Sequence, residues 1–487
     1  SIWVDNIVAI SPVRTPALAW HPTPIDGADK VLWQSSLNWL PGDSAVSHNV
    51  YFGTTNPPPF VVNQTGTTFN PGPLDLDKTY YWRIDEVNES NPDSPWIGKV
   101  WSFTTQDALV RYPYLQNVTQ SSVQVMWGTY DDETGSKLYW GSAPGDYTHS
   151  VSSVVFEDTG GYQVHTATIS GLTPGEKVYY YLDAGPGTVG KDDSSYYATA
   201  APSGNASFRF IDYGDTHYTP NAHLRISKAM RKHNPDLVLL SGDIASAGQV
   251  WQFDDYLFTP DAALMKNTPY FTAIGNHDLP FPIASSYEHD NYRDMFSLPT
   301  NSANGTEDYY SFDYGSVHFV SLDTELVLGR YKNAARAAEM TAWLKKDLAA
   351  TKKPWKIAFF HKPTYLNEVG AAFRRIFEDN GMNLVFSGHI HTYDSHYRNG
   401  VTYITSGGAN RRANPYRKGW PDYRIYGLRT YNFIVVDVTL NKLDIKAYND
   451  DNVLFQELVV VPERTKPTSL PVGSSSSGIK AEGKLSK

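Results

Sequence analysis

Residues 383 to 391 read Asn-Leu-Val-Phe-Ser-Gly-His-Ile-His, and this stretch decides the fold of the C-terminal half of the chain. Its apolar run does not alternate with polar residues, which is typical of a strand covered on both faces. The polar residues that follow begin with glycine, which lets the chain turn sharply off a strand. We therefore expect a buried strand whose carboxyl end presents two histidines.

Four other segments repeat this pattern. Apolar runs at 208–212, 236–240, 270–274 and 356–360 are followed by Gly214-Asp-Thr-His217, Ser241-Gly-Asp-Ile244, Gly275-Asn-His-Asp278 and His361-Lys-Pro363. Helical apolar spacing at 222–232, 335–350 and 371–379 alternates with the runs and predicts an α/β domain. Ligands of open α/β sheets bind beyond the carboxyl ends of the strands. Carboxylate, imidazole and amide groups at that edge predict a metal site.

Short β-type runs separated by turn residues fill the first 200 residues. Aromatic and polar residues alternate in them, as in Thr79-Tyr-Tyr-Trp-Arg-Ile84 and Lys177-Val-Tyr-Tyr-Tyr-Leu182. This pattern of short alternating runs and turns predicts two antiparallel sandwiches that resemble fibronectin type III modules. The predicted divisions of the chain are 1–18 as a strand or linker, 19–106 and 107–202 as the sandwiches, 203–460 as the α/β domain and 461–487 as a flexible tail.

Composition limits the chemistry of the site. The chain contains no cysteine, which excludes disulfides, thiolate nucleophiles and iron–sulfur clusters. Its formal net charge of −10 argues against a general nucleic-acid binder, because binding along phosphates needs clustered lysine and arginine. No apolar run is long enough for a transmembrane helix. The start at Ser1 without methionine predicts a secreted or periplasmic protein whose leader has been removed.

The order Asp-x-His, Gly-Asp, Gly-Asn-His-Asp, His, Gly-His-x-His resembles the calcineurin-like metallophosphoesterase family. Residues 309–323, 343–348 and 388–393, with Tyr112-Pro-Tyr-Leu-Gln116 in the second sandwich, resemble its purple acid phosphatase branch. The resemblance covers about residues 108 to 458 and implies a two-sheet β-sandwich flanked by helices that binds two metal ions. Purple members carry an iron-binding tyrosine in Gly-Asp-x-x-Tyr, whereas Ser246 stands there in this chain. We therefore expect a two-metal centre that lacks the visible charge-transfer band of an iron-bound tyrosinate.

The resemblance also assigns roles to individual residues. It implies that Asp243 bridges two metal ions, each held by three further ligands: Asp215, His217 and His391 for the first, and Asn276, His361 and His389 for the second. Iron, manganese and zinc, alone or mixed, suit such nitrogen and oxygen ligands. Two ions would generate a bridging hydroxide as the nucleophile. His277 resembles the catalytic histidine that protonates the leaving group, and Asp278 would orient it.

Four further residues are candidates for substrate binding. Tyr393 and His396 follow the Gly-His-Ile-His turn and are placed at the pocket. Arg411 and Arg412 open a basic loop after residues 406–408, and guanidinium groups suit phosphate oxygens. Alternatively, the two arginines belong to a solvated surface loop and pair with acidic residues elsewhere in the protein. Carbohydrate or cell-surface contact through the first sandwich stays an open expectation.

These features predict a secreted metal-dependent phosphoesterase acting on small phosphate esters, in the manner of an acid-phosphatase-like phosphomonoesterase. A phosphodiesterase of the nucleotide or glycerophosphodiester type is the alternative, because two-metal centres support both reactions. A catalytically dead binding or scaffold protein is a further alternative. The complete set of predicted ligands, together with His277, argues against it.

Overall fold

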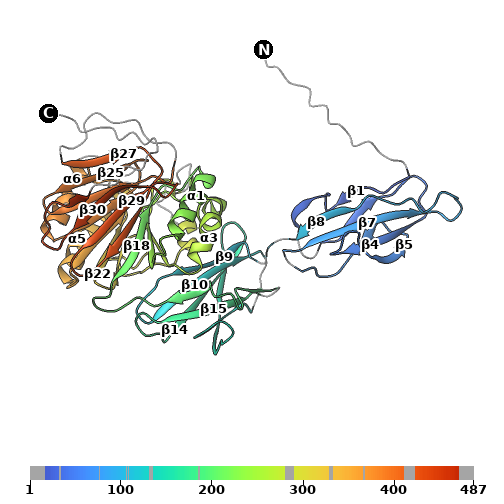
Figure 1. Cartoon of the computed structure of the whole chain (residues 1–487), viewed down its shortest axis with the longest axis horizontal. Coiled ribbons are helices and arrows are strands. Elements are labelled where there is room, and N and C mark those ends of the chain that lie inside the picture. The colour runs from blue at the N-terminus through green and yellow to red at the C-terminus, as the bar shows by residue number, and fades with distance from the viewer. Residues whose placement is uncertain are drawn as a thin grey trace, which may run out of the picture. The chain divides into compact units, whose positions relative to one another are not determined.

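The computed structural model divides the chain into two compact units, Ser1–Ala108 and Leu109–Lys487. Figure 1 shows β-structure in the first unit, and β-structure together with an α/β domain in the second. The structure describes residues 17–31, 35–75, 77–105, 107, 109–130, 135–184, 187–279, 290–327, 333–365, 368–410 and 423–470.

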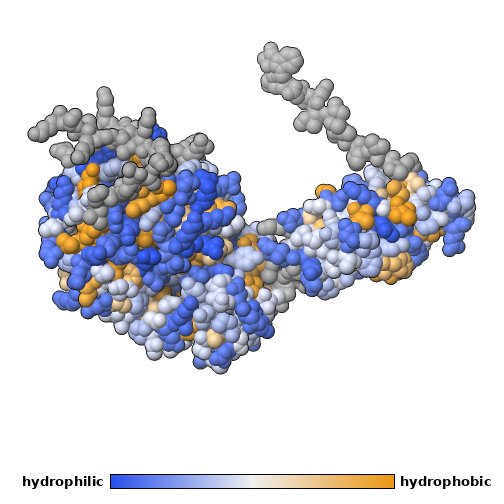
Figure 2. Space-filling view, viewed as in Figure 1, coloured by the Kyte–Doolittle hydropathy of each residue, from blue (hydrophilic) through white to orange (hydrophobic). Residues whose placement is uncertain are grey.

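The first unit is a sandwich of two sheets. One sheet has the order β1-β3-β6 and the other β2-β8-β7-β4-β5. The strands are β1 Trp20–Thr23, β2 Ala28–Val31, β3 Leu37–Leu40, β4 Ser47–Gly53, β5 Phe60–Gln64, β6 Thr68–Phe69, β7 Thr79–Val87 and β8 Trp101–Thr105. Trp39, Trp82 and Trp101 are buried between the sheets, as the alternating pattern predicts. Figure 2 shows hydrophilic side chains over much of the visible surface.

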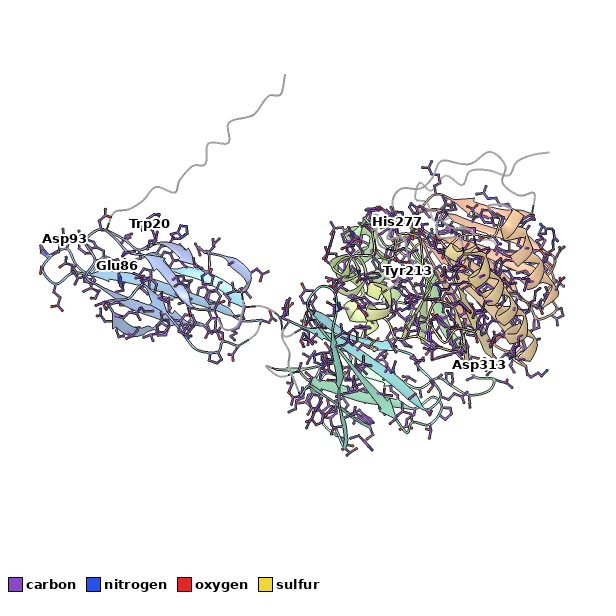
Figure 3. The ribbon with its side chains drawn as sticks, turned by 180° about the vertical axis from the view of Figure 1, so that it is seen from behind. Trp20, Glu86, Asp93, Tyr213, His277 and Asp313 are labelled. Carbon is purple, nitrogen blue, oxygen red and sulfur yellow. The ribbon has the colours of Figure 1, made fainter. Side chains whose placement is uncertain are left out.

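A buried polar pair, His48 and Glu86, lies inside this sandwich. His48 Nδ1 pairs with Glu86 Oε2, and Glu86 Oε1 accepts a hydrogen bond from the Gly42 N–H at 2.9 Å. Figure 3 labels Glu86 within the first unit. Because a buried carboxylate needs partners, this arrangement satisfies Glu86 inside the sandwich.

The second sandwich opens the second unit. Its sheets have the orders β13-β14-β10-β9 and β12-β11-β15-β16, with β17 paired to β15. The strands are β9 Arg111–Gln116, β10 Ser122–Thr129, β11 Lys137–Gly141, β12 His149–Ser152, β13 Val154–Glu157, β14 Gln163–Ser170, β15 Lys177–Asp183, β16 Thr188–Val189 and β17 Tyr197–Thr199.

Two seven-stranded sheets form the rest of the second unit. Their orders are β20-β19-β18-β28-β29-β30-β31 and β21-β22-β23-β24-β26-β25-β27. The strands of the first are β18 Phe208–Tyr213, β19 Leu237–Leu240, β20 Tyr270–Thr272, β28 Phe433–Val438, β29 Leu443–Tyr448, β30 Leu454–Val460 and β31 Thr468–Leu470. Those of the second are β21 Tyr310–Tyr314, β22 Val317–Leu322, β23 Trp355–Phe360, β24 Leu384–Ser387, β25 Tyr393–Arg398, β26 Val401–Ser406 and β27 Arg424–Leu428. Phe210 of one sheet contacts Phe319 and Phe386 of the other, so aromatic rings fill the space between them.

Helices cover these sheets. They are α1 Pro220–Arg231, α2 Val250–Phe253, α3 Thr259–Met265, α4 Asp290–Met295, α5 Ala334–Ala350 and α6 Glu368–Asp379, with a π-helix at Asp254–Phe258 and a 3-10 helix at Thr324–Leu326. Leu344 of α5 and Phe377 of α6 share a core with Val320 and Phe360 of the second sheet. The architecture predicted from the sequence, β modules followed by an α/β domain with two sheets and flanking helices, is confirmed.

Two local predictions differ from the structure. The helical segment from Val250 to Met265 was not expected, because its helical turns are short and a π-helix interrupts their 3.6-residue period. β31 lies inside the segment predicted as a flexible tail and pairs with β30. Three residues are too few for strand alternation to be visible in a sequence.

The second sandwich and the α/β domain share buried polar contacts. Arg111 lies on β9, and its Nη2 donates to Asp158 Oδ2 at 2.8 Å and to Asp254 Oδ2 at 3.1 Å. Tyr114 Oη donates to the Met295 carbonyl at 3.0 Å, and Tyr114 is fully buried. These bonds explain why residues from 109 onward form one compact unit.

Candidate metal centre

Parallel strands bring the predicted ligands to one edge of the fold. β18 pairs with β19 and β19 with β20 in parallel, so Asp215, Asp243 and Asn276 all follow carboxyl ends at the same edge. β23 and β24 are also parallel, and they deliver His361 and His389. The convergence expected from the five polar strings is therefore present in the fold.

Glycines make room for this convergence. A Cβ atom at position 275 would lie 2.2 Å from the Asp243 nitrogen. A Cβ at 388 or 407 would lie 2.6 or 2.5 Å from Asp215 Oδ2. Atoms cannot approach that closely, so only glycine allows the ligand loops to pack against one another.

Three of the ligand candidates have left-handed backbone. The φ angles are 63° at Asp215, 56° at Asp243 and 67° at His389. Such values are uncommon outside glycine, and they cluster at functional sites where the surrounding structure enforces them. The turns off β18, β19 and β24 therefore aim these side chains at the expense of backbone strain.

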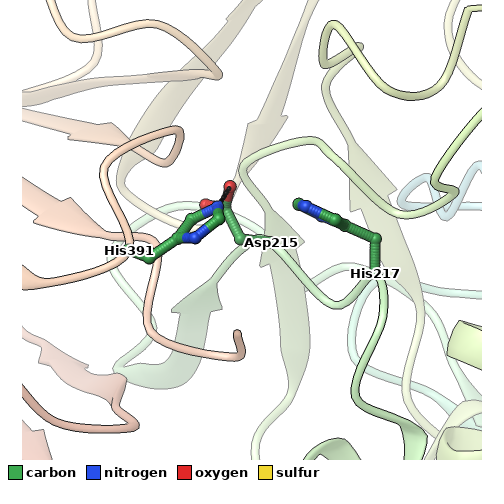
Figure 4. Close-up of side chains that lie close together, drawn as sticks. All are labelled: Asp215, His217 and His391. Carbon is green, nitrogen blue, oxygen red and sulfur yellow. Dashed lines mark ion pairs between the residues drawn. The ribbon is translucent and has the colours of Figure 1, made fainter. Parts of the chain in front are cut away.

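Asp215, His217 and His391 form the first group of candidate ligands, and Figure 4 shows their side chains facing one another. One ligand atom from each lies within 4.8 Å of the others. His391 Nε2 is 3.2 Å from Asp215 Oδ1. His217 Nδ1 donates to the Asp243 carbonyl at 3.0 Å, which leaves Nε2 as the ligand nitrogen.

Asp243, His361 and His389 form the second group. His361 Nε2 lies 3.0 Å from Asp243 Oδ2 and 3.1 Å from His389 Nδ1. His361 Nδ1 is 3.0 Å from the Ser241 carbonyl and donates to it. His361 Nε2 is therefore the nitrogen that faces the other two ligands.

The chemistry of these donors fits bound cations. Among the described residues, none donates a hydrogen bond to the buried oxygens Asp215 Oδ1 and Asn276 Oδ1, although buried oxygens are nearly always satisfied. Burial lowers the pKa of His389 to about 2, and the charge of His361 adds to that shift. Burial alone would lower the pKa of His361 as well, but Asp243 outweighs it and raises the value to about 9. A metal ion would satisfy oxygen and nitrogen lone pairs that one proton cannot.

His277 is half-buried and forms a third group of possible ligands with His217 and Asp243, which overlaps the other two. Its ring centroid is 4.6 Å from that of His217, and its main-chain N–H donates to Asp243 Oδ1 at 2.8 Å. Its Nδ1 donates to the Ser246 carbonyl at 3.0 Å, so Nε2 remains as the nitrogen for proton transfer. Figure 3 labels His277 in the second unit.

Asp278 has a different role from the one predicted. It does not hold the His277 ring, because the Ser246 carbonyl does. Its carboxylate instead accepts hydrogen bonds from the main-chain N–H groups of Asp243, Ile244, Ala245 and Gly275, at 3.0, 2.7, 2.8 and 2.8 Å. Burial, followed by the charge of Asp243, raises the pKa of Asp278. The residue therefore fixes the backbone of the predicted bridging turn.

The structure does not offer Tyr393 and His396 to a substrate. Both are fully buried on β25. Tyr393 Oη donates to Gln456 Oε1 at 2.5 Å. The His396 ring packs against that of Tyr365, and burial followed by the charge of Arg424 lowers its pKa to about 3. The start of β25 is buried on both faces, so Tyr393 and His396, which point to opposite faces, are both enclosed, contrary to the prediction from their place after the turn. Arg411 and Arg412 lie outside the described residues.

Sequence reasoning missed a buried carboxyl beneath the ligands. Asp212 accepts hydrogen bonds from Ser241 Oγ at 2.7 Å and from Ser406 Oγ, and burial raises its pKa to about 8. It joins the ends of β18, β19 and β26 under the site. The signal was present, because Asp212 is the acidic residue at the end of the apolar run 208–212.

A buried ion pair next to His361 was missed as well. Lys362 Nζ lies 2.7 Å from Glu325 Oε2, and both side chains are almost fully buried. Lys362 occupies the middle of the string His361-Lys-Pro363, but its partner comes from the 3-10 helix after β22. Nothing in the spacing of the sequence indicates that contact.

Comparisons with known proteins agree with this geometry. Residues 208–393 match the model of the calcineurin-like phosphoesterases, and residues 112–200 match that of the purple acid phosphatase N-terminal domain. The chain is 28% identical to purple acid phosphatase 15 of Arabidopsis thaliana over 47% of this chain and 49% of the relative. It is 26% identical to a phosphoenolpyruvate phosphatase of Allium cepa over 59% of this chain and 63% of the relative. The chain thus spans about half to two thirds of the length of these two relatives.

A solved structure shares the fold. The purple acid phosphatase PPD1 from yellow lupin (Lupinus luteus) seeds superimposes with a TM-score of 0.59 and 13% identity, over 88% of this chain and 92% of the lupin chain. None of the described helices has the length and apolarity needed to cross a membrane. The chain therefore carries a calcineurin-like phosphoesterase domain at residues 208–393, preceded by a purple acid phosphatase N-terminal domain at residues 112–200.

Proposed function

We propose that this protein is a metal-dependent phosphoesterase that hydrolyses small phosphate monoesters. The observation that carries the proposal is the pair of adjacent ligand groups at the strand ends, one around Asp215 and the other around Asp243. The family match supports the phosphoester substrate class. The similarity to a protein named phosphoenolpyruvate phosphatase favours a monoester over a diester.

In this proposal the residues divide between two metal ions. Asp215, His217 and His391 would hold the first, Asn276, His361 and His389 the second, and Asp243 both. Bound metals of this kind activate water at neutral pH and neutralise the phosphoryl oxygens. Iron, manganese and zinc all suit the donors, and the residue at the tyrosinate position is Ser246.

The chain's own groups manage the leaving group and the rigidity of the site. His277 Nε2 would donate a proton to the leaving oxygen, while the Nδ1 bond to Ser246 fixes the ring. The four amide bonds to Asp278 keep the Asp243 turn in place. Because Asp243 also accepts from the His277 N–H, the proton donor and the proposed bridging ligand are positioned by one turn.

The decisive experiment compares p-nitrophenyl phosphate with bis-p-nitrophenyl phosphate on the metal-loaded protein, with metal content measured in parallel. Faster turnover of the monoester supports the proposal, and faster turnover of the diester assigns the protein as a phosphodiesterase. Bound metal without either activity would make it a binding or scaffold protein. Asp243→Asn is the matched control, since it removes the charge of the ligand proposed for both metals with little change in shape.

Two further expectations belong to the same proposal. An extracytoplasmic location, expected from the sequence, is tested by fractionating the native cells. Carbohydrate or cell-surface contact of the first sandwich is tested by glycan-array binding of the whole chain. Neither result alters the assignment of the metal ligands.

A further inference from the structure

A cavity of about 700 Å³ lies between the second sandwich and the α/β domain. Its walls come from β15 and β17 of the sandwich, from the end of α1, and from the segments that lead into β19 and β20. All these elements belong to the second compact unit. The cavity is large enough for a small molecule and is partly open to solvent.

Positive charge dominates the lining. Five basic side chains contribute to it: Lys177, Lys228, Arg231, Lys232 and Lys266. Asp236 is the acidic residue of the lining, and it accepts a hydrogen bond from the Arg209 N–H at 2.7 Å. A cavity with this excess of positive charge stands out in a protein of formal net charge −10. Such local fields attract anions even where the whole protein repels them.

Three of the cations come from the C-terminal end of α1 and the residue that caps it. Lys228, Arg231 and Lys232 are spaced i, i+3 and i+4, so they lie on the same side of the helix end. All three are exposed, and among the described residues none forms an ion pair with them. Their charges are therefore available to an incoming ligand.

The two remaining cations are held in place. Lys266 Nζ donates to Ser195 Oγ at 2.6 Å and lies over the Tyr196 ring at 4.4 Å. Lys177 Nζ lies 3.5 Å from the centroid of the Tyr197 ring. Burial lowers the pKa of Lys266, Asp193 at 3.9 Å opposes the shift, and the charge of Arg231 adds to it. An anion between Lys266 and Arg231 would relieve this repulsion.

The cavity is separate from the metal centre. The lining residues Asn234, Pro235 and Asp236 precede β19, and Thr268 and Pro269 precede β20. The metal-ligand candidates Asp243 and Asn276 follow the same two strands. The two sites therefore lie at opposite ends of β19 and β20.

We propose that this cavity is a second binding site, which takes a small, multiply charged oxyanion carrying phosphate, sulfate or carboxylate groups. The cations approach the cavity from three directions, so each can contact a separate anionic group of the ligand. A ligand with a single charge could not use all of them. The volume of about 700 Å³ matches a small molecule. The inference does not depend on the proposed hydrolysis.

Titration calorimetry on the metal-loaded full chain tests the site, with inositol hexasulfate as a probe that a phosphatase cannot consume and citrate as the carboxylate probe. The cavity variants are Lys228→Glu/Arg231→Glu and the milder Lys228→Gln/Arg231→Gln. The matched control is Lys345→Glu/Lys346→Glu, which changes the same number of exposed cations on α5. Asp243→Asn reports binding at the metal centre instead.

We expect binding by the native protein that weakens about tenfold or more in both cavity variants, because each lost charged hydrogen bond is worth a severalfold change in affinity. Binding should persist in the α5 control and in Asp243→Asn. Preference for one probe identifies the anionic group. Absence of binding, equal binding by the cavity variants, or loss only in Asp243→Asn would each overturn the proposal. In the first two cases the basic residues of α1 would serve only its helix dipole.

Discussion

The two compact units contain similar sandwiches that bury their polar groups differently. In the first unit, Glu86 is satisfied within the sandwich by His48 and Gly42. In the second, Arg111 of the sandwich is satisfied partly from outside it, by Asp254 of the π-helix. The second sandwich therefore depends on the α/β domain for partners of its buried charge, whereas the first sandwich supplies such partners from its own residues. Substitutions in each unit should separate these roles.

The largest contrast is expected in catalysis. His277→Ala should lower turnover of p-nitrophenyl phosphate by about 10² to 10⁴, the range for one general acid, with both metals retained. Steady-state kinetics and metal analysis of the same sample measure this. His48→Ala in the first unit is the control and should leave turnover unchanged. Loss of metal from the His277 variant would show that the residue holds the site together instead of transferring protons.

The next largest effect is a loss of stability at the junction, which is the contact between the second sandwich and the α/β domain around Arg111. Arg111→Ala leaves Asp158 and Asp254 without their buried partner, and breaking such a pair typically costs about 3–5 kcal/mol. Calorimetry should show the transition of the second unit moving to lower temperature while that of the first stays in place. The comparison variant is Arg83→Ala, which breaks the pair with Asp85 inside the first unit. If Arg111→Ala moved neither transition, the junction would not stabilise the second unit.

His318 should make the stability of the second unit depend on pH. Burial alone would lower the pKa of His318, but hydrogen bonds to Asp313 and Asp347 raise it to about 9. Since the folded pKa lies above the unfolded value of about 6.5, the stabilisation is complete below pH 6.5 and is lost as the pH rises to about 9. The raised pKa of His318 corresponds to up to about 3 kcal/mol of stability for the second unit, at about 1.4 kcal/mol per pKa unit.

The measurement is the denaturant midpoint of each unit between pH 6 and 9.5. In His318→Gln the second unit should lose this pH dependence, and the first unit should show no change on substitution. An unchanged slope in the variant would mean that other groups control the alkaline behaviour.

The smallest effect is expected from removing residues 1–108. Because the first unit has its own core, the remaining chain should keep its turnover within about twofold. Kinetics of the shortened and full chains with p-nitrophenyl phosphate compare them directly. A large loss would show that the self-contained sandwich also supports the metal centre.

The sequence was most informative where local patterns have one structural solution. Mainly apolar runs followed by short polar segments predicted the strand ends that now carry Asp215, Asp243 and His361. Helices with regular spacing, such as α5, were predicted almost to their ends. In both cases the information lies within a few neighbouring residues.

Contacts between distant segments were not predictable. Asp278 was matched to its neighbour His277, but its four donors include the turn after β19. Tyr393 was placed at the pocket by its position after a turn, but β25 is buried on both faces there and Tyr393 bonds to Gln456 of β30. Arg111 meets Asp254 across 143 residues of sequence. Only the packed fold brings such partners together.

The left-handed backbone at Asp215, Asp243 and His389 has a consequence for evolution and engineering. Each such residue costs about 1–3 kcal/mol that glycine would not, so selection for folding alone would drift these positions toward glycine. Screens for heat-stable variants should therefore recover glycine at the metal ligands and lose activity with it. A library scored for both properties would keep Asp and His there, which separates the demands of the catalyst from those of the fold.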